Sequence, residues 1–237
     1  PTNISPVPYP MASGEICDRY GVLLILDEVM CGMGRTGHLF ACEAEGIAPD
    51  ILCIAKGLGA GYQPIGAMLC TDEIYDTISA GSGFFQHGHT YVGHPVAAAA
   101  GLAVIREILD NDLVTQVQQR GRYFCEQLQA RFGQHPHVGD IRGRGLFWGI
   151  ELVADRETKA PFDPALGLAG KLKKAAFAEG LICYPMPGTR DGKIGDHVLL
   201  APPFIATESA LCMAADCLAR ALDRVLAACS AKPAPPA

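Results

Sequence analysis

Several features that mark other classes of protein are missing from this sequence of 237 residues. Its net charge of −6 offers no basic surface, which argues against nucleic acid or an anionic membrane as a partner. Its longest strand-like aliphatic run has five residues, and the alanine-rich stretch 96–105 is too short to cross a bilayer. The first residues do not follow the pattern of a secretory signal. We therefore expect a cytoplasmic protein whose partners are neither nucleic acid nor a membrane.

Paired cysteine motifs are absent as well. Ten cysteines are scattered through apolar segments, and no two of them form a CxxC pair. Small buried thiols in a reducing cytosol are the interpretation that we favour, and a disulfide framework is the alternative. The composition, with 49% hydrophobic and 19% charged residues, is ordinary for a soluble globular enzyme. The length suffices for one large or two modest domains.

The stretch 22–29 places an acid at the end of an apolar run. Residues 22–26 are all apolar, which predicts a strand buried on both faces, as in a parallel sheet. Asp27 follows at the carboxyl end, where open α/β sheets bind their ligands. A carboxylate there needs a cation or a protonated ring nitrogen as its partner. Val29 shares the face of Asp27 if the chain stays extended, so this face suits a flat cationic ring.

Lys56 follows the stretch 50–54, which is apolar after Asp50 and is also predicted to be a buried strand. Its neighbours are small residues, and partial desolvation among them would lower the pKa of the amine and expose a nucleophile. Enzymes that use pyridoxal 5′-phosphate (PLP) provide two such groups: an acid that pairs with the pyridinium nitrogen and a lysine that forms a Schiff base with the aldehyde.

The order and spacing of five motifs carry a family resemblance. The sequence resembles the class III (omega) aminotransferases of PLP fold type I from about Glu15 to its last helix. The motifs are Asp27-Glu28-Val29, Gly32-Met33-Gly34-Arg35-Thr36-Gly37, Pro49-Asp50-Ile51, Ala55-Lys56-Gly57 and His89-Thr90-Tyr91-Val92-Gly93-His94-Pro95.

The resemblance implies a role for four residues. Lys56 would be the Schiff-base lysine, Asp27 the partner of the ring nitrogen, and Val29 the platform under the ring. Thr90 would donate to the cofactor phosphate of the neighbouring subunit, so that the active site lies at the interface of a homodimer. Glu28 points away from Asp27 and is expected to have a structural role.

The resemblance also implies an α/β fold, with part of the large PLP-binding domain on a mostly parallel sheet and a small α+β C-terminal domain. We expect these at residues 1–110 and 135–230, joined by a helix at 111–134 and followed by a disordered tail at 231–237. Family members carry roughly another half-chain before this point, so we expect the C-terminal part of such an enzyme.

The elements predicted from patterning are a loop at 1–12, helices at 13–20, 39–46, 72–79, from 95 onward, 112–132, 165–179 and 207–228, and strands at 22–27, 50–54, 64–70, 138–152, 181–184 and 198–200.

Two rival interpretations rest on single motifs. The glycines of 32–37 satisfy GxGxxG and could indicate an NAD-dependent dehydrogenase. However, five residues separate the apolar run from Gly32, and no acid for a ribose ends the next strand. His87, His89 and His94 could suggest zinc, but no carboxylate or thiol accompanies them at ligand spacing, so we expect no metal.

Two departures from the family pattern narrow the substrate class. Met30 stands where the ornithine- and 4-aminobutyrate-type members have glutamine, and Leu199 stands where they have a carboxylate-binding arginine. Leucine offers no bidentate pair to a carboxylate, so the sequence resembles the omega-amino acid or amine–pyruvate aminotransferases. Arg190 is the candidate for the substrate carboxylate, with a surface role beside Asp191 as the alternative, and Arg144 is a weaker candidate.

The predicted function is therefore ping-pong transamination, in which an amine, omega-amino acid or amino acid donates its amino group to a 2-oxo acid such as pyruvate. Other class III chemistry, that of decarboxylases or 2,1-aminomutases, uses the same aspartate and lysine and is the first alternative. An inactive fragment that lacks the N-terminal half of the enzyme is the second.

Overall fold

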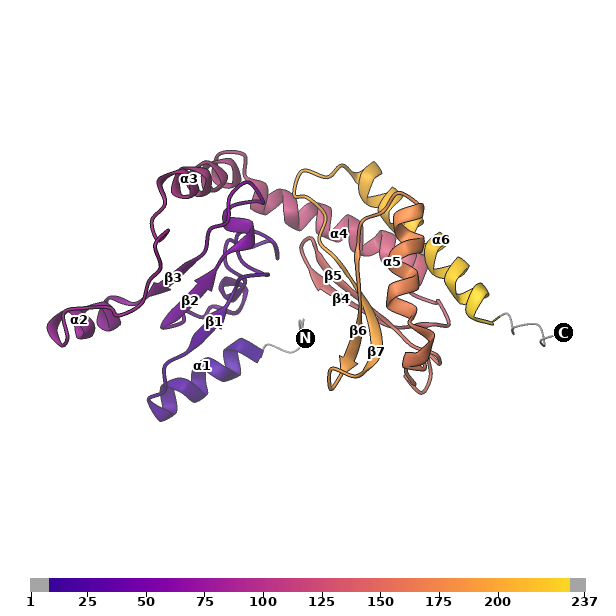
Figure 1. Cartoon of the computed structure of the whole chain (residues 1–237), viewed down its shortest axis with the longest axis horizontal. Coiled ribbons are helices and arrows are strands. Elements are labelled where there is room, and N and C mark those ends of the chain that lie inside the picture. The colour runs from indigo at the N-terminus through magenta and orange to yellow at the C-terminus, as the bar shows by residue number, and fades with distance from the viewer. Residues whose placement is uncertain (1–8, 231–237) are drawn as a thin grey trace. The chain divides into compact units, whose positions relative to one another are not determined.

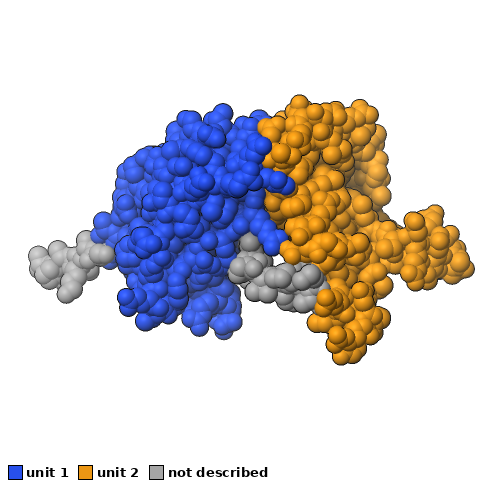
Figure 2. All heavy atoms as spheres, turned by 180° about the vertical axis from the view of Figure 1, so that it is seen from behind, with its two compact units in different colours: residues 1–4, 118–237 blue, residues 5–117 orange. Residues whose placement is uncertain are grey.

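The computed structural model describes residues 9–230, which form two compact units (Figure 2). The N-terminal unit comprises the described residues up to Val117, and the C-terminal unit begins at Gln118. The division falls within helix α4 (Leu113–Phe132), which lies inside the predicted connecting helix 111–134. The predicted tail 231–237 and residues 1–8 of the predicted loop lie outside the described residues. Among the helices of the described part, none combines the length and apolar character that a bilayer crossing requires.

The N-terminal unit is built around a three-stranded sheet with the order β1-β2-β3 (Figure 1). Strand β1 (Ile25–Asp27) runs parallel to β2 (Ile51–Ile54), and β3 (Ala67–Cys70) runs antiparallel to β2. The other elements of this unit are α1 (Tyr9–Tyr20), the short 3₁₀ helices η1 (Ala41–Glu45) and η2 (Lys56–Leu58), α2 (Asp72–Ala80) and α3 (Pro95–Asp110).

Two predictions about the start of the chain are wrong. Helix α1 begins at Tyr9 instead of Ser13, because Pro10 is compatible with the first turn of a helix. The strand predicted at 22–27 is confirmed only over Ile25–Asp27, and it is not buried on both faces. The side chains of Val22 and Ile25 are 58% and 59% exposed. The reason is that β1 lies at the edge of the sheet, and no further strand of the described residues pairs with its free side.

The C-terminal unit contains a four-stranded antiparallel sheet with the order β4-β5-β7-β6 (Figure 1). Its elements are the main part of α4, the strands β4 (Val138–Arg144) and β5 (Phe147–Leu152), the 3₁₀ helix η3 (Pro164–Leu166), α5 (Leu168–Ala178), the strands β6 (Tyr184–Arg190) and β7 (Ile194–Leu200), and α6 (Glu208–Ser230).

The strands of this unit form two hairpins, which the patterning did not predict. The single strand expected at 138–152 is two strands, because the chain turns at Gly145 and Leu146. The strand expected at 181–184 is wrong except at Tyr184, where β6 begins, and the strand expected at 198–200 is the last part of the longer β7, which follows β6 directly. Proline at 185 and 187 concealed β6, yet proline is tolerated here because β6 is an edge strand.

The core of the C-terminal unit lies among α4, α5, α6 and the sheet. Phe124, Leu128 and Phe132 recur at a spacing of four along α4 and are almost completely buried. Leu218 and Leu222 of α6 are equally buried. Each such side chain contributes about 1.5–3 kcal/mol to folding, so this unit has a core of its own.

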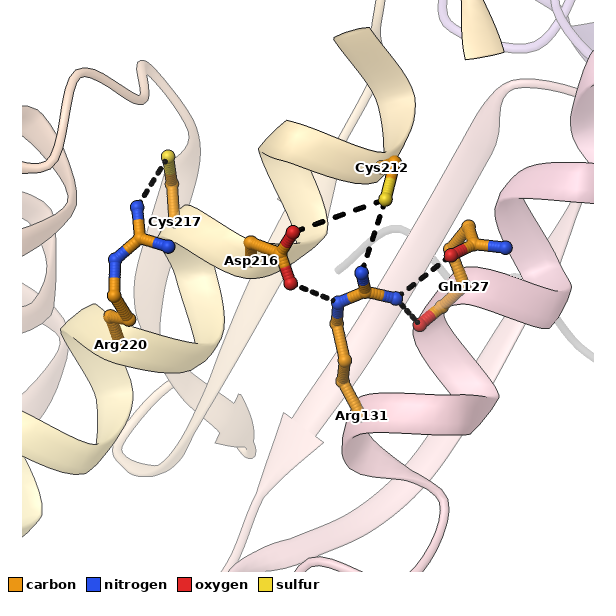
Figure 3. Close-up of polar contacts among 6 residues, drawn as sticks. All are labelled: Gln127, Arg131, Cys212, Asp216, Cys217 and Arg220. Carbon is orange, nitrogen blue, oxygen red and sulfur yellow. Dashed lines mark hydrogen bonds and ion pairs between the residues drawn. The ribbon is translucent and has the colours of Figure 1, made fainter. Parts of the chain in front are cut away.

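Arg131 connects α4 to α6 (Figure 3). Its Nε donates to Asp216 Oδ1 at 2.7 Å, and one terminal nitrogen donates to Cys212 Sγ at 3.2 Å. The other terminal nitrogen donates to the carbonyl and side-chain oxygens of Gln127. Hydrogen bonding to Arg131 lowers the pKa of Asp216, so the pair stays charged at neutral pH.

All ten cysteines are free thiols in the structure, so the disulfide framework considered above is not formed. Burial, with a smaller contribution from Glu28, raises the pKa of the Cys31 thiol to about 11. Burial, together with a hydrogen bond to Glu28 and its charge, raises that of Cys42 to about 12. Both thiols near the end of β1 are therefore protonated and weakly nucleophilic at neutral pH.

Candidate active site

The structure brings Asp27 and Lys56 to the same edge of the N-terminal sheet. Asp27 is the last residue of β1 and pairs in register with Cys53 of β2. Lys56 comes three residues after Cys53, and only Ala55 separates it from the end of β2. Because the two strands are parallel and adjacent strands lie about 4.8 Å apart, both residues belong to the carboxyl edge, where α/β sheets bind ligands.

The side chain of Asp27 is exposed and is oriented by its own backbone. Its Oδ1 accepts a hydrogen bond from the Val29 N–H at 3.0 Å. Within residues 9–230, Oδ2 of Asp27 has no hydrogen bond, so this oxygen is available to a ligand. Val29 itself is half-buried and follows the strand end by two residues.

Lys56 has an unusual backbone conformation. Its φ is +40°, in the left-handed region, which costs a residue other than glycine about 1–3 kcal/mol. The Leu58 N–H donates to Ala55 O at 2.9 Å, and the Gly59 N–H donates to Lys56 O at 3.1 Å. The side chain is exposed, and its ammonium forms no hydrogen bond or ion pair with any residue of the described part. Residues held in such conformations are concentrated at functional sites.

Glu28 lies on the other side of the chain from Asp27 and is almost completely buried. Its carboxylate accepts hydrogen bonds from the N–H groups of Ala41 and Cys42, at 2.6 and 2.8 Å, at the start of η1. The expected structural role of Glu28 is therefore confirmed.

The loop 32–37 does not have the structure of a dinucleotide-binding turn. In that motif the glycines lead directly into a long helix whose N-terminus meets the pyrophosphate. Here a series of turns, including Gly34 N–H to Leu39 O at 3.1 Å, leads to the short 3₁₀ helix η1. This geometry speaks against the dehydrogenase alternative.

Thr90 lies in an exposed turn just before α3. The flanking histidines each use Nδ1 as an acceptor: His89 accepts from the Tyr91 N–H at 3.2 Å, and His94 accepts from the Ala97 N–H at 3.4 Å. His94 thereby caps the helix that Pro95 begins. Across residues 9–230, no group of three or more His, Cys, Asp or Glu side chains is arranged to hold a metal ion.

Arg190 belongs to the C-terminal unit, whereas the four other candidate residues belong to the N-terminal unit. It is the last residue of β6 and is exposed. The hairpin turn that follows has positive φ at Asp191 (55°) and Gly192 (69°) and is closed by Lys193 N–H to Arg190 O at 3.0 Å. The Asp-Gly pair is the usual signal for such a turn and would have located the hairpin from sequence. Arg144, the weaker candidate, ends β4 and is exposed too.

The chain belongs to the class-III aminotransferases, because the model of that family matches residues 2–222. Enzymes of this family depend on PLP. An aminotransferase of Gibberella zeae is 49% identical over 201 residues, which are 84% of this chain and 39% of that protein.

Solved structures show the same fold. A thermostable (S)-enantioselective omega-transaminase from Thermomicrobium roseum superposes with a TM-score of 0.83 at 36% identity, over 92% of this chain and 47% of that one. A PLP-bound aminotransferase mutant from Vibrio fluvialis gives a TM-score of 0.85 at 34% identity, over 93% and 47%. The chain therefore has the α/β fold of the PLP-dependent transaminases and spans less than half the length of these relatives.

Proposed function

We propose that the protein catalyses PLP-dependent transamination. The observation that carries this proposal is the position of Asp27 and Lys56 at the ends of two adjacent parallel strands, on one edge of the sheet. One residue offers an unoccupied carboxylate oxygen and the other an exposed amine. An anionic group for a ring nitrogen and an amine for an aldehyde are the donor set that PLP requires.

Four residues would hold the cofactor. Lys56 would bind the aldehyde carbon through its Nζ, and Asp27 would keep the ring nitrogen protonated through its carboxylate. Val29 would support the ring. Thr90 would donate its hydroxyl to the phosphate of a second subunit, which fits its exposure in the turn before α3. When bound, PLP supplies an electron sink for the carbanion that forms on the amino donor.

The residues of the chain would supply proton transfer and charge. With PLP bound, the Lys56 amine would act as general base and acid, taking a proton from the carbon of the amino donor and giving it back.

For the substrates we propose an amine or omega-amino acid as donor and pyruvate or a similar 2-oxo acid as acceptor. Leu199 is buried in β7 and has no charge to offer a carboxylate, and Met30 lacks a strong hydrogen-bonding group. Arg190, exposed at the tip of its hairpin, is proposed to bind the carboxylate of the 2-oxo acid.

We further propose the assembly and location typical of such enzymes: a cytoplasmic homodimer with the active site at the interface. Residues 1–110 would be part of the large domain, 135–230 the small domain, and 111–134 the helix between them. The chain spans less than half the length of the three relatives described above, and the transamination of a full-length enzyme is therefore part of this proposal. Decarboxylase or aminomutase chemistry at the same residues, and a chain that is inactive alone, are the alternatives.

The test is covalent trapping at Lys56. The purified chain is mixed with PLP, and the amine and aldehyde join with loss of water. Borohydride then delivers hydride to the carbon–nitrogen double bond, and peptide mass spectrometry locates the stable secondary amine. We expect the adduct at Lys56 and its loss in Lys56→Ala, with Lys173→Ala, an exposed lysine of α5, as the matched control. Equal labelling of both variants would contradict the proposal.

A donor and acceptor screen addresses the substrates. The protein is supplied with pyruvate or 2-oxoglutarate and a series of amines, and the amino acid that forms is measured. A strong preference for 2-oxoglutarate would show that the inference from Leu199 is wrong. Release of carbon dioxide, or an internally shifted amino group, would favour the alternative class III reactions.

A further inference from the structure

Glu28 is at the centre of a hydrogen-bond network beside the candidate site. Its N–H donates to Cys53 O of β2 at 2.9 Å, and its own carbonyl accepts from the Gly32 N–H at 2.9 Å. Its two carboxylate oxygens accept from the N–H groups of Ala41 and Cys42. With a side chain that is only 3% exposed, Glu28 ties together the end of β1, the strand that leads to Lys56, and both ends of the loop 29–40.

The loop that Glu28 holds carries Met33 onto the turn of Lys56. Met33 is 3% exposed and has a φ of +56°. It packs against Gly57 so closely that a Cβ at Gly57 would lie 3.0 Å from Met33 Cβ and 3.6 Å from Met33 Cγ. An alanine at position 57 would therefore require Met33 to shift by a few tenths of an ångström.

The other side of the same turn is covered by α3. Leu58 is buried, and a Cβ at Gly101 of α3 would lie 3.7 Å from its carbonyl oxygen. The turn of Lys56 is therefore packed between the loop and the helix. Because a lysine in the left-handed region would relax to an ordinary conformation if it were free to do so, these contacts must hold it there.

We propose that Glu28 and the contact between Met33 and Gly57 position Lys56, holding its backbone in the left-handed conformation that directs the amine to the edge where Asp27 lies. This inference rests on the proposed function. Glu28 is a positioning residue in this proposal: it acts through the loop and touches neither substrate nor cofactor.

The experiment uses a substitution and its compensating partner in the full chain. Gly57→Ala inserts a methyl group against Met33. Met33→Gly removes the opposing Cβ at a residue whose positive φ suits glycine, so the double variant restores the space. Glu28→Gln leaves one of its two N–H partners facing an amide group. Gly170→Ala, in α5 with no atom within 4 Å, is the matched control.

Two measurements are made on each variant. The first is the apparent dissociation constant for PLP from trapping at Lys56, measured across a range of pH. The second is amide hydrogen exchange of residues 55–60 without PLP. We expect Gly57→Ala and Glu28→Gln to raise the dissociation constant about tenfold, which corresponds to ~1.4 kcal/mol, and to speed exchange. The double variant should recover both values.

The proposal is overturned if Gly57→Ala behaves like Gly170→Ala, or if the double variant is no better than Gly57→Ala. Absence of the adduct from the unsubstituted chain would contradict the proposed function instead. In that case the exchange rates alone decide whether loop and turn are coupled: recovery in the double variant supports the coupling, and unchanged exchange refutes it.

Discussion

Two glycines in the helices of the C-terminal unit are expected to respond to alanine with opposite signs. Gly121 lies in α4, where an added Cβ would be 2.4 Å from the carbonyl oxygen of Gly145 and 2.6 Å from its carbonyl carbon. Gly170 lies in α5, where the added Cβ would meet nothing within 4 Å. The two substitutions are chemically identical, so they isolate the effect of the close approach.

The magnitudes follow from the geometry. Alanine stabilises a helix interior by about 1 kcal/mol relative to glycine, so Gly170→Ala should stabilise the chain by ~0.5–1 kcal/mol. At Gly121 the helix and the turn at Gly145 must separate by about 1 Å to reach an ordinary contact, and both partners are backbone. Overpacking of this kind costs about 3 kcal/mol, so the net destabilisation should be ~2 kcal/mol.

Trp148 provides the assay, because it is the sole tryptophan and belongs to this unit. Its indole N–H donates to Gly145 O at 2.8 Å, the same oxygen that the methyl group of Gly121→Ala would meet. Urea unfolding followed by tryptophan fluorescence should therefore report the stability of the C-terminal unit. With a slope of ~2 kcal/mol per molar urea, the midpoint of Gly121→Ala should fall by ~1 M.

Midpoints for Gly121→Ala that equal or exceed those of the unsubstituted chain would refute this reasoning. A midpoint that falls equally in Gly170→Ala would do the same, because it would show that alanine is unfavourable for a reason other than the contact with Gly145.

Two further predictions concern Asp196 and Arg190. Burial raises the pKa of Asp196 above its ordinary 3.8, so the folded chain binds this proton more tightly, and stability falls as the pH rises from the unfolded to the folded pKa. Asp196→Asn, whose amide oxygen still accepts from the Ala169 N–H, should flatten urea midpoints across that range; an unaltered slope would exclude burial as the cause. Arg190→Leu should raise KM for the 2-oxo acid about tenfold or more, since a charge-assisted hydrogen bond contributes ~1.5–3 kcal/mol. Its KM for an amine without a carboxylate should stay constant, and equal losses for both substrates would remove Arg190 from carboxylate recognition.

Much of the site could be predicted from the sequence because its signals are local. An acid directly after an apolar run and a lysine directly after the next one lie at strand ends whatever the rest of the chain does. Parallel pairing then brings Asp27 and Lys56 to one edge, as expected for an α/β sheet. The structural role of Glu28 also followed from alternation along an extended strand.

The burial of β1 could not be predicted in the same way. An apolar run indicates that a strand can be buried, but whether it is buried depends on what lies beside it. In this chain β1 is an edge strand, and Ile25 in it and Val22 just before it are exposed apolar side chains. The hairpins of the C-terminal unit were missed for a different reason, since two prolines in β6 masked a strand that only its edge position permits.

The sequence by itself determined which residues can carry the chemistry and to which family the chain belongs, because these depend on residue type and on spacing within short segments. Only the tertiary structure decided how Lys56 is held. The left-handed backbone of that lysine, the packing of Met33 on Gly57 and the four hydrogen bonds of Glu28 join segments that the sequence keeps apart. These contacts depend on how closely segments that are distant in the sequence approach one another in the fold, and residue patterns do not encode that distance.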